Sequence, residues 1–271
     1  MPEYSDQIGR KFELKTPPRH IVCLVPSLTE LLCDLGLEDN LVGVTKFCVH
    51  PKNLRKAKTD IGGTKKLHLD RIKALNPDLI IANKEENNRN EVEELSRRYP
   101  VYVSDIESFD DVHSFIADMG ALSGKESQAQ KLNDEITEAV STLKNKALNQ
   151  ELLRAVYLIW KDPFMAAGTD TFITKMLSLC GVQNALSDWG EKGLRYPELT
   201  IKEIESINPE IILLSSEPYP FKDKHLKEIG AETGLPVKLV DGEAFSWYGS
   251  RILHCLPYLQ RFVQDLPSFY R

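Results

Sequence analysis

Two segments of the sequence decide the fold: LDRIKALNPDLIIA at residues 69–82 and IKEIESINPEIILL at residues 201–214. Isoleucine, asparagine, proline and isoleucine coincide between them, and apolar positions match apolar positions. Each segment predicts a short helix that ends at Asn-Pro, because proline lacks the amide hydrogen of a helical hydrogen bond and restricts its predecessor. The aliphatic run that follows is typical of a buried strand in a parallel sheet. The match predicts two similar α/β lobes; the alternative is coincidence, since helix–Pro–strand units are common.

A second pattern also occurs once in each half of the chain: an apolar strand, a loop and a capped helix. Residues 19–25 (RHIVCLV) predict a buried strand, and the next helix begins through Ser27, whose spacing to Glu30 is that of a capping box. Residues 155–160 (AVYLIW) predict the corresponding strand of the second half, and residues 168–171 (GTDT) begin its helix. The order of elements therefore supports the repeat.

One long amphipathic helix is predicted between the two halves. Residues 123–126 (SGKE) cap a segment that runs to about Asn149 without a further glycine or proline, and apolar residues recur along it at helical spacing. A helix of this length, roughly 35 Å at 1.5 Å per residue, is a stiff connector. We expect an α/β protein with mainly parallel sheets: an N-terminal lobe (1–107), a linking segment with the backbone helix (108–150) and a C-terminal lobe (151–271).

The composition fits a globular chain without affinity for nucleic acids. Its 271 residues include 34 Lys plus Arg against 40 Asp plus Glu, a formal charge of -6, and 42% of them are hydrophobic. This is enough apolar material for a full core and excludes disordered and collagen-like classes. Because phosphate binding needs concentrated basic residues, we expect no nucleic-acid partner. No stretch reaches the roughly 18 apolar residues of a membrane span, and we expect a monomer.

Cysteine usage and the first residues bear on the compartment. The five cysteines form an odd, scattered set without CxxC spacing, and three of them lie among aliphatic residues, so we interpret them as reduced and mostly buried thiols. The first twenty residues lack the apolar run of a secretory signal. The sequence as it stands predicts a cytoplasmic protein, or a periplasmic or otherwise extracytoplasmic one if a signal segment has been removed.

The sequence carries no established catalytic motif. G-x-S-x-G, HExxH, GxxxxGK[ST] and GxGxxG are all absent, so acyl transfer, zinc hydrolysis, P-loop chemistry and Rossmann dinucleotide binding lack their signatures. Residues 61–66 (IGGTKK) imitate a phosphate loop, but we interpret them as an ordinary glycine turn. Cys48 and His50 offer two potential metal ligands, yet no third lies beside them in the sequence.

The informative residues are aromatic side chains in the loops that follow buried strands. In α/β lobes these loops lie at the carboxyl ends of the strands, where ligands bind. Aromatic faces suit stacking on a flat or conjugated ligand, and Arg251 beside them could pair with a carboxylate, phosphate or amide oxygen. Packing in the lobe core is the alternative role for each ring. The residues are Phe47, Phe164 with Met165, Tyr196, Tyr219, Phe221, Phe245, Trp247 and Tyr248.

These motifs together resemble the substrate-binding proteins of iron-siderophore, haem and cobalamin ABC importers, a periplasmic-binding-protein superfamily whose two lobes are joined by a helical backbone. The resemblance covers about residues 19 to 260 and is closest to the cobalamin-binding branch. It implies a class III substrate-binding fold and a receptor that is not an enzyme and requires no cofactor. The segments that carry it are RHIVCLVPSLTELLCDLGL, LVGVTKFCVHP, IGGTKKLHLDRIKALNPDLIIA, FMAAGTDTFITKMLSLCGVQNAL, SEPYPF and FSWYGSR.

The resemblance implies a ligand site in the cleft between the lobes. Phe47 stands where the cobalamin binder carries a tyrosine, Met165 where it carries a phenylalanine, and Tyr196 where it carries a tryptophan. The Thr64 region lacks a tryptophan of that binder. We expect the bound ligand to be a corrinoid, haem or another tetrapyrrole, or a ferric chelate. The residues expected to bind it are Phe47, Thr64, Phe164, Met165, Tyr196, Trp247, Tyr248 and Arg251.

The resemblance also implies a docking partner. In the importers one surface carboxylate on each lobe pairs with arginines of the membrane permease. Asp70 matches the first carboxylate, whereas the symmetric position is Lys202, with Glu203 beside it. Because a cation repels arginine, Lys202 should weaken docking to an ABC permease through Asp70 and Glu203. This favours a relative that has left the transport pathway.

Two other functions stay open from the sequence. One is a receptor of the same superfold for a metal ion (Zn, Mn or Fe), which requires three or four converging ligands. Its candidate ligands are His50, His68, Glu30 and Asp70. The other is an enzyme that uses the cleft, which requires paired carboxylates with perturbed titration. Its candidate acids are Glu30, Asp170 and Glu217.

Overall fold

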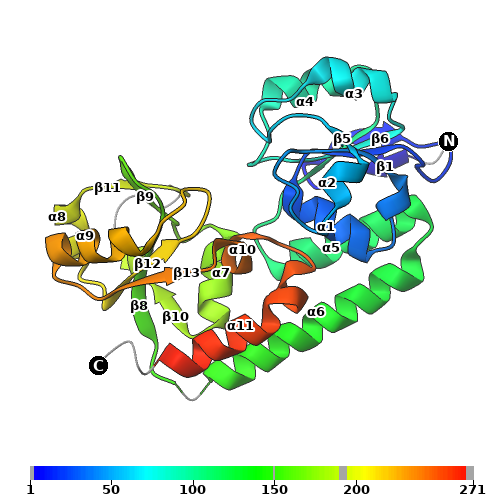
Figure 1. The fold of residues 1–271 in the computed structure, drawn as a ribbon. Coiled ribbons are helices and arrows are strands. Elements are labelled where there is room, and N and C mark those ends of the chain that lie inside the picture. Colours follow the sequence, from blue (N-terminus) through cyan, green and yellow to red (C-terminus); the bar gives the residue numbers. More distant parts are fainter. Residues whose placement is uncertain (1–2, 149, 189–193, 267–271) are drawn as a thin grey trace. The chain divides into compact units, whose positions relative to one another are not determined.

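The computed structural model describes residues 3–148, 150–188 and 194–266. The chain divides into two units: unit 1 is Met1–Ile136 with Tyr248–Arg251, and unit 2 is Thr137–Trp247 with Ile252–Arg271. Each unit is an α/β lobe with a mainly parallel sheet (Figure 1), as the sequence predicts.

Unit 1 is built on five parallel strands in the order β5-β4-β3-β6-β7. The chain runs outward from β3 through β4 to β5, and then crosses to the other side of β3 for β6 and β7. The direction of winding therefore changes between β3 and β6. The strands are β3 (Ile21–Cys23), β4 (Leu41–Val44), β5 (Thr59–Asp60), β6 (Leu79–Asn83) and β7 (Val101–Ser104).

Helices connect these strands, and a two-stranded antiparallel hairpin precedes the sheet. The hairpin strands are β1 (Glu3–Ser5) and β2 (Lys11–Glu13). The helices are α1 (Pro26–Asp34), the short 3-10 helix η1 (Glu38–Asn40), α2 (Leu54–Ala57), α3 (Leu69–Leu75), α4 (Arg89–Ser96) and α5 (Phe109–Ser123).

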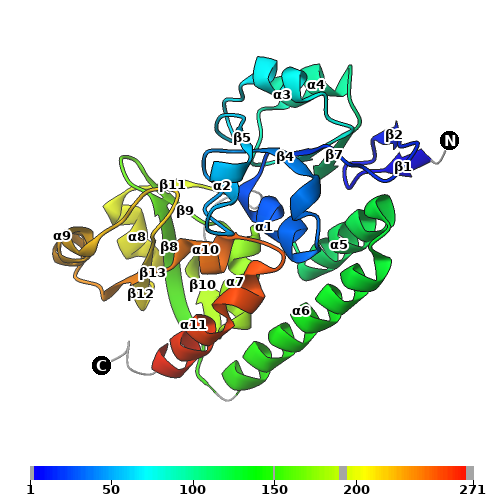
Figure 2. The same cartoon turned by 45° about the vertical axis from the view of Figure 1, so that its right-hand side comes forward.

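The predicted connecting helix is α6 (Glu126–Ala147), which follows α5 after a left-handed glycine, Gly124. Its 22 residues span about 33 Å at 1.5 Å per residue. Its part up to Ile136 belongs to unit 1 and its part from Thr137 belongs to unit 2. Within unit 1, α5 and the first half of α6 run side by side (Figures 1 and 2).

Unit 2 is built around the long strand β8, which pairs in parallel with β12 on one side and with β10 on the other. The carboxyl half of β8 also pairs with the antiparallel strand β9, which continues to β11. The strands are β8 (Leu153–Trp160), β9 (Phe164–Ala166), β10 (Val182–Asn184), β11 (Glu198–Leu199), β12 (Ile211–Ser215) and β13 (Val237–Val240). The helices are α7 (Phe172–Leu179), η2 (Ala185–Asp188), α8 (Ile201–Ile207), α9 (Asp223–Thr233), α10 (Gly242–Ser246) and α11 (Arg251–Asp265).

The Asn-Pro junctions have the same structure in both units. α3 ends at Leu75 and α8 ends at Ile207, and the next residue takes a left-handed φ of 44° at Asn76 and 50° at Asn208. Asparagine tolerates this backbone conformation better than most residues with a Cβ atom. The buried strands β6 and β12 follow each proline, so the repeat that predicts two similar lobes is confirmed.

An acidic residue after each proline ties this junction to the neighbouring strand. The Asp78 amide donates to the His20 carbonyl at 3.0 Å, and its carboxylate accepts from the amides of Arg19 at 2.8 Å and His20 at 2.9 Å. Glu210 bonds Arg154 in the same way: its amide donates to the carbonyl at 2.8 Å and its Oε2 accepts from the amide at 2.7 Å. Equivalent residues therefore hold equivalent strands in the two sheets.

The two hydrophobic cores also use equivalent positions. Ile72 of α3 and Ile80 of β6 are fully buried in unit 1, as Ile204 of α8 and Ile212 of β12 are in unit 2. Each helix therefore covers its sheet through the same apolar positions of the repeat, which lie four residues before and four residues after the asparagine.

Replacing Asp78 with alanine should destabilise unit 1, because the amides of Arg19 and His20 lose their common acceptor. We expect a loss of about 1–2 kcal/mol in the free energy of unfolding, within the range for bonds to charged groups at a partly exposed place. Urea unfolding followed by circular dichroism measures it. Asp39→Ala, at an exposed acid of the same unit, is the control and should change stability by less than about 0.5 kcal/mol. Equal effects of both changes would contradict the anchoring role.

Candidate functional site

The carboxyl edge of the unit 1 sheet carries Phe47, in the loop after β4. Its side chain is 49% exposed, although the loop around it is held by Thr45, whose hydroxyl accepts from the Phe47 amide at 3.3 Å. The ring lies against Gly63 of the loop after β5, where an added Cβ would come within 3.1 Å of the ring. Lys46 Nζ lies 5.0 Å from the ring centroid. Phe47 is therefore an exposed aromatic surface that its neighbours hold in place.

Thr64 belongs to a tight turn after β5. The Gly63 amide donates to the Lys66 carbonyl at 2.9 Å, and Gly62 pairs with Leu67 as an isolated β-bridge. Gly62 takes a φ of 99°, which a residue with a Cβ atom rarely adopts. The segment that imitates a phosphate loop is thus a glycine turn, as predicted.

Asn87, which the sequence analysis missed, joins three loops at this edge. It follows β6, and its side-chain amide donates to the carbonyls of Thr64 at 3.0 Å and Leu24, just after β3, at 3.1 Å. Its Oδ1 accepts from the Asn83 amide at 2.9 Å. The signal in the sequence is a pair of asparagines, at the end of an aliphatic strand and four residues later. Asn87 therefore positions the turn that carries Thr64.

The strand pairing in unit 2 separates Phe164 from Met165. Phe164 pairs with Leu199 and packs against the buried core of the unit. Met165 pairs with Glu198 on one side and with Trp160 on the other. Because paired residues share one face of a sheet and neighbours alternate, Met165 lies on the face opposite Phe164.

Trp160 is a second residue that the expected site omitted. It is the last residue of β8, its side chain is 39% exposed, and its ring meets that of Tyr219 at 5.5 Å in an edge-to-face arrangement. Tyr219 follows β12, which pairs with β8. At β12 the chain crosses to the other side of β8, after β9 and β11 on the first side. Phe221 and Phe245 are buried, so core packing is their role. The signal for Trp160 was its place at the carboxyl end of an apolar strand.

Tyr196 lies in a segment that is held closely against β9 and the residues after it. The Gly168 amide donates to the Arg195 carbonyl at 2.7 Å, and the Ala166 amide donates to the Pro197 carbonyl at 3.0 Å. A Cβ at Gly168 would lie 2.2 Å from the Leu194 carbonyl oxygen, so only glycine permits this approach. Tyr196 itself is half-buried.

Trp247 of unit 2 and Tyr248 of unit 1 are both buried. In unit 2 the Trp247 indole donates from Nε1 to Glu217 Oε1 at 2.7 Å, and the Ser246 hydroxyl donates to the same oxygen at 2.9 Å. Glu217 follows β12 and so fixes the indole at the carboxyl edge of its sheet. A pocket of about 530 Å³ in the same unit is lined by Ser216, Glu217, Leu239, Val240, Asp241, Glu243 and Tyr258.

Arg251 forms a buried ion pair with Glu30 within unit 1. Its Nε donates to Glu30 Oε2 at 2.8 Å, and its Nη2 donates to Glu30 Oε1. The predicted capping box of Ser27 and Glu30 is wrong, because α1 begins at Pro26 after Val25 and has no side-chain cap. The physical reason is a long-range contact: the Glu30 carboxylate is hydrogen-bonded to Arg251, which lies 221 positions further along the chain. The guanidinium that was expected to face a ligand has this protein partner.

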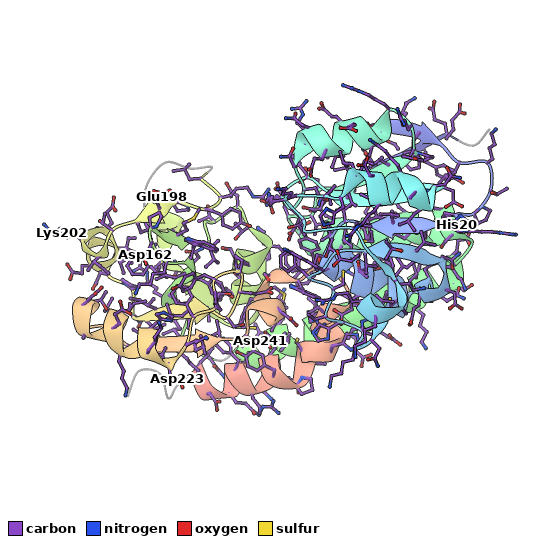
Figure 3. The ribbon with its side chains drawn as sticks, turned by 45° about the horizontal axis from the view of Figure 1, so that its top comes forward. His20, Asp162, Glu198, Lys202, Asp223 and Asp241 are labelled. Carbon is purple, nitrogen blue, oxygen red and sulfur yellow. The ribbon has the colours of Figure 1, made fainter. Side chains whose placement is uncertain are left out.

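The two residues expected to dock a permease differ in their surroundings. Asp70 is exposed in the first turn of α3. Glu203 forms a capping box, because its Oε2 accepts from the amide and the hydroxyl of Thr200, both at 2.7 Å, and these bonds lower the pKa of Glu203. Lys202 is exposed and points away from the body of its unit (Figure 3). Lys202 and the exposed Glu205 are thus the outward charges of α8.

The described residues contain no group of three or more His, Cys, Asp and Glu side chains that could hold a metal ion. The alternative of a metal-ion receptor, with His50, His68, Glu30 and Asp70, thus lacks its cluster.

Burial raises the pKa of the Cys23 thiol to about 12 and raises the pKa of Cys48, which keeps both protonated at neutral pH. No helix in the described part of the chain has the length and apolar character to cross a membrane.

Two α/β lobes with exposed side chains at the carboxyl edges of their sheets, joined by one long helix, define the class of helical-backbone ligand-binding proteins. The profile of the family described as periplasmic binding protein matches residues 21–234. The chain belongs to this family, and it is a substrate-binding protein related to those of ABC importers.

Individual relatives agree with the family. The vitamin B12-binding protein of Vibrio parahaemolyticus is 26% identical over 200 residues, which cover 73% of this chain and 71% of the relative. An uncharacterized ABC transporter substrate-binding lipoprotein, YvrC of Bacillus subtilis, is 27% identical over 217 residues, which cover 77% of this chain and 67% of the relative.

Solved structures show the same fold. The periplasmic vitamin B12-binding protein BtuF of Vibrio cholerae superimposes with a TM-score of 0.78 at 20% identity and covers 93% of this chain and 99% of its own. The periplasmic haem-binding protein RhuT of Roseiflexus sp. RS-1, in its apo form, also gives 0.78 at 20% identity, with 91% and 98% covered.

Breaking the Glu30–Arg251 pair from one side should be costly, because the other charge stays buried without its partner. We expect Glu30→Leu and Arg251→Met, each made alone, to lower the free energy of unfolding by about 3–5 kcal/mol. The double change Glu30→Leu with Arg251→Met should recover most of this loss, since both charges are removed. A double-mutant cycle from urea unfolding measures the coupling. Additive effects of the single changes would show that the two side chains do not depend on each other.

Proposed function

We propose that this chain is a non-catalytic receptor that captures a corrinoid, another tetrapyrrole such as haem, or an iron chelate. Its membership of the family and the names of its relatives support this class of ligand. The observation that carries the proposal is Phe47, a ring that is about half exposed at the carboxyl edge of a parallel sheet. An aromatic ring at this place suits stacking on a flat or conjugated ligand.

Each unit carries its own set of proposed ligand contacts. In unit 1 they are the ring of Phe47 and the turn at Thr64, and in unit 2 they are Met165 and Tyr196, with Trp160 added. We assign supporting roles to the other expected residues because each has an interior partner or a buried place. Phe164 packs on the core, Trp247 is bonded to Glu217, Tyr248 is buried and Arg251 is paired with Glu30.

Docking to a permease is a separate proposal. Asp70 supplies an exposed carboxylate for it, whereas the Glu203 carboxylate bonds to the start of its own helix beside the exposed Lys202. We propose a monomer that captures its ligand and docks to an ABC permease weakly, because the exposed Lys202 of α8 stands at the position of the second docking carboxylate and repels an arginine of the permease.

Phe47→Ala should weaken ligand binding about tenfold or more, because the variant loses an aromatic stacking surface. Stacking and the burial of this ring by the ligand together contribute roughly 1–3 kcal/mol to the binding free energy. Purified protein is titrated with cobalamin, haem and a ferric siderophore while tryptophan fluorescence is followed. Leu152→Ala is the control. This side chain is 60% exposed and lies just before β8, at the amino end of the strand and away from the carboxyl edge of the sheet. Its loss should leave the affinity for the ligand unchanged.

Two results would contradict the proposed function. One is the absence of quenching by any of the three ligands below about 1 mM, which corresponds to only about -4 kcal/mol. The other is an equal loss of affinity in Phe47→Ala and Leu152→Ala, which would place the ligand away from this edge.

A further inference from the structure

Positive charge is concentrated in the part of unit 1 that carries Phe47. Residues 46–66 contain six lysines and one arginine but a single acidic residue, Asp60, whereas the whole chain has a formal charge of -6. The Asp60 carboxylate is turned to the backbone, where its Oδ1 accepts from the Gly62 amide at 2.8 Å. This stretch is therefore strongly basic in an otherwise acidic protein.

Some side chains of this basic stretch donate hydrogen bonds to main-chain oxygens. Arg55 donates to the Lys46 carbonyl at 2.7 Å, and Lys65 donates to the Glu85 carbonyl. Carbonyl partners fix the positions of these cations without cancelling their charge. One acid lies near Lys65: burial raises the pKa of the Glu86 carboxyl, and the positive charge of Lys65 opposes this rise.

The ring and the cations lie together. The Lys46 stem and the Phe47 ring both border Gly63, at 3.5 Å and 3.1 Å from the position of an added Cβ. Thr64, Lys65 and Lys66 follow directly in the same turn, and both of these lysines are exposed. The Phe47 ring thus has the Lys46 ammonium over it, and its loop contacts the turn that carries Lys65 and Lys66.

We propose that the ligand carries carboxylate or phosphate groups around a flat face, and that Lys46, Lys65 and Lys66 recognise those anions while Phe47 supports the face. This inference rests on the proposed function and narrows its ligand class. A ligand whose edge carries only neutral amides would give the three lysines no anionic partner. A ligand with carboxylate or phosphate groups would accept charge-assisted hydrogen bonds from the lysine ammonium groups. A nucleic acid is a poorer occupant, because the remainder of the chain is acidic and offers no extended basic track.

Two pairs of probes test this proposal, each with one macrocycle in an anionic and a neutral form. They are dicyanocobyrinic acid against dicyanocobinamide, and haem against haem dimethyl ester. The full chain should bind the carboxylate form of at least one pair about tenfold more tightly, and added salt should reduce this preference. Each lysine-to-alanine change should lower the affinity for the anionic form about threefold to fivefold, which is the range of an exposed ion pair.

The triple variant Lys46→Ala, Lys65→Ala, Lys66→Ala should abolish the preference and leave affinity for the neutral form nearly unchanged. Phe47→Ala should weaken both forms equally. Lys131→Ala, at a lysine of α6 with 77% side-chain exposure, is the matched control and should alter neither.

The outcomes separate the inference from the function on which it rests. Equal affinity for both forms, or tighter binding of the neutral form, would overturn the anionic ligand class while the receptor function stands. A preference that survives in the triple variant would overturn the assignment of the lysines. Failure of every probe to bind would overturn the proposed function and this inference with it.

Discussion

Parallel pairing of strands is the constraint on which the rest of this structure depends. When strands run in one direction, all the loops that follow them lie at the same edge of the sheet. In unit 1 this brings together Phe47 after β4, Thr64 after β5 and Asn87 after β6, although forty residues separate the first from the last. In unit 2 it brings Trp160, the last residue of β8, beside Tyr219 after β12. Each unit thus assembles its candidate site without any sequence motif.

Long-range polar contacts then decide which side chains stay available at these edges. The Glu30 carboxylate accepts hydrogen bonds from the Arg251 guanidinium, and the Glu217 carboxylate accepts one from the Trp247 indole. Both are buried or half-buried, where a polar group without a partner is costly. What remains exposed is therefore a different set from the one that residue type alone suggests: Phe47 and Trp160 rather than Arg251 and Trp247.

The sequence predicts the fold well because the fold depends on local signals. Asn76 and Asn208 mark two helix ends, and the apolar runs after them mark two central strands. The uninterrupted segment after Gly124 marks the connecting helix.

Side-chain roles were harder to predict because they depend on pairing and on distant partners. Neighbours in a strand lie on opposite faces, but which of Phe164 and Met165 faces the core depends on how β9 pairs with β8 and β11, and no spacing reveals this pairing. The Glu30–Arg251 pair joins opposite ends of the chain, so a local capping pattern was the wrong explanation of Glu30.

Ligand capture at the carboxyl edges is tested most directly by backbone amide hydrogen exchange of the full chain, with and without a saturating ligand that quenches its fluorescence. Binding at these edges predicts slower exchange in the loops after β4 and β5 and in residues 194–197, with no change in the loops before β3 and β8. Protection confined to the loops before those strands, or to the pocket beside Tyr258, would contradict it.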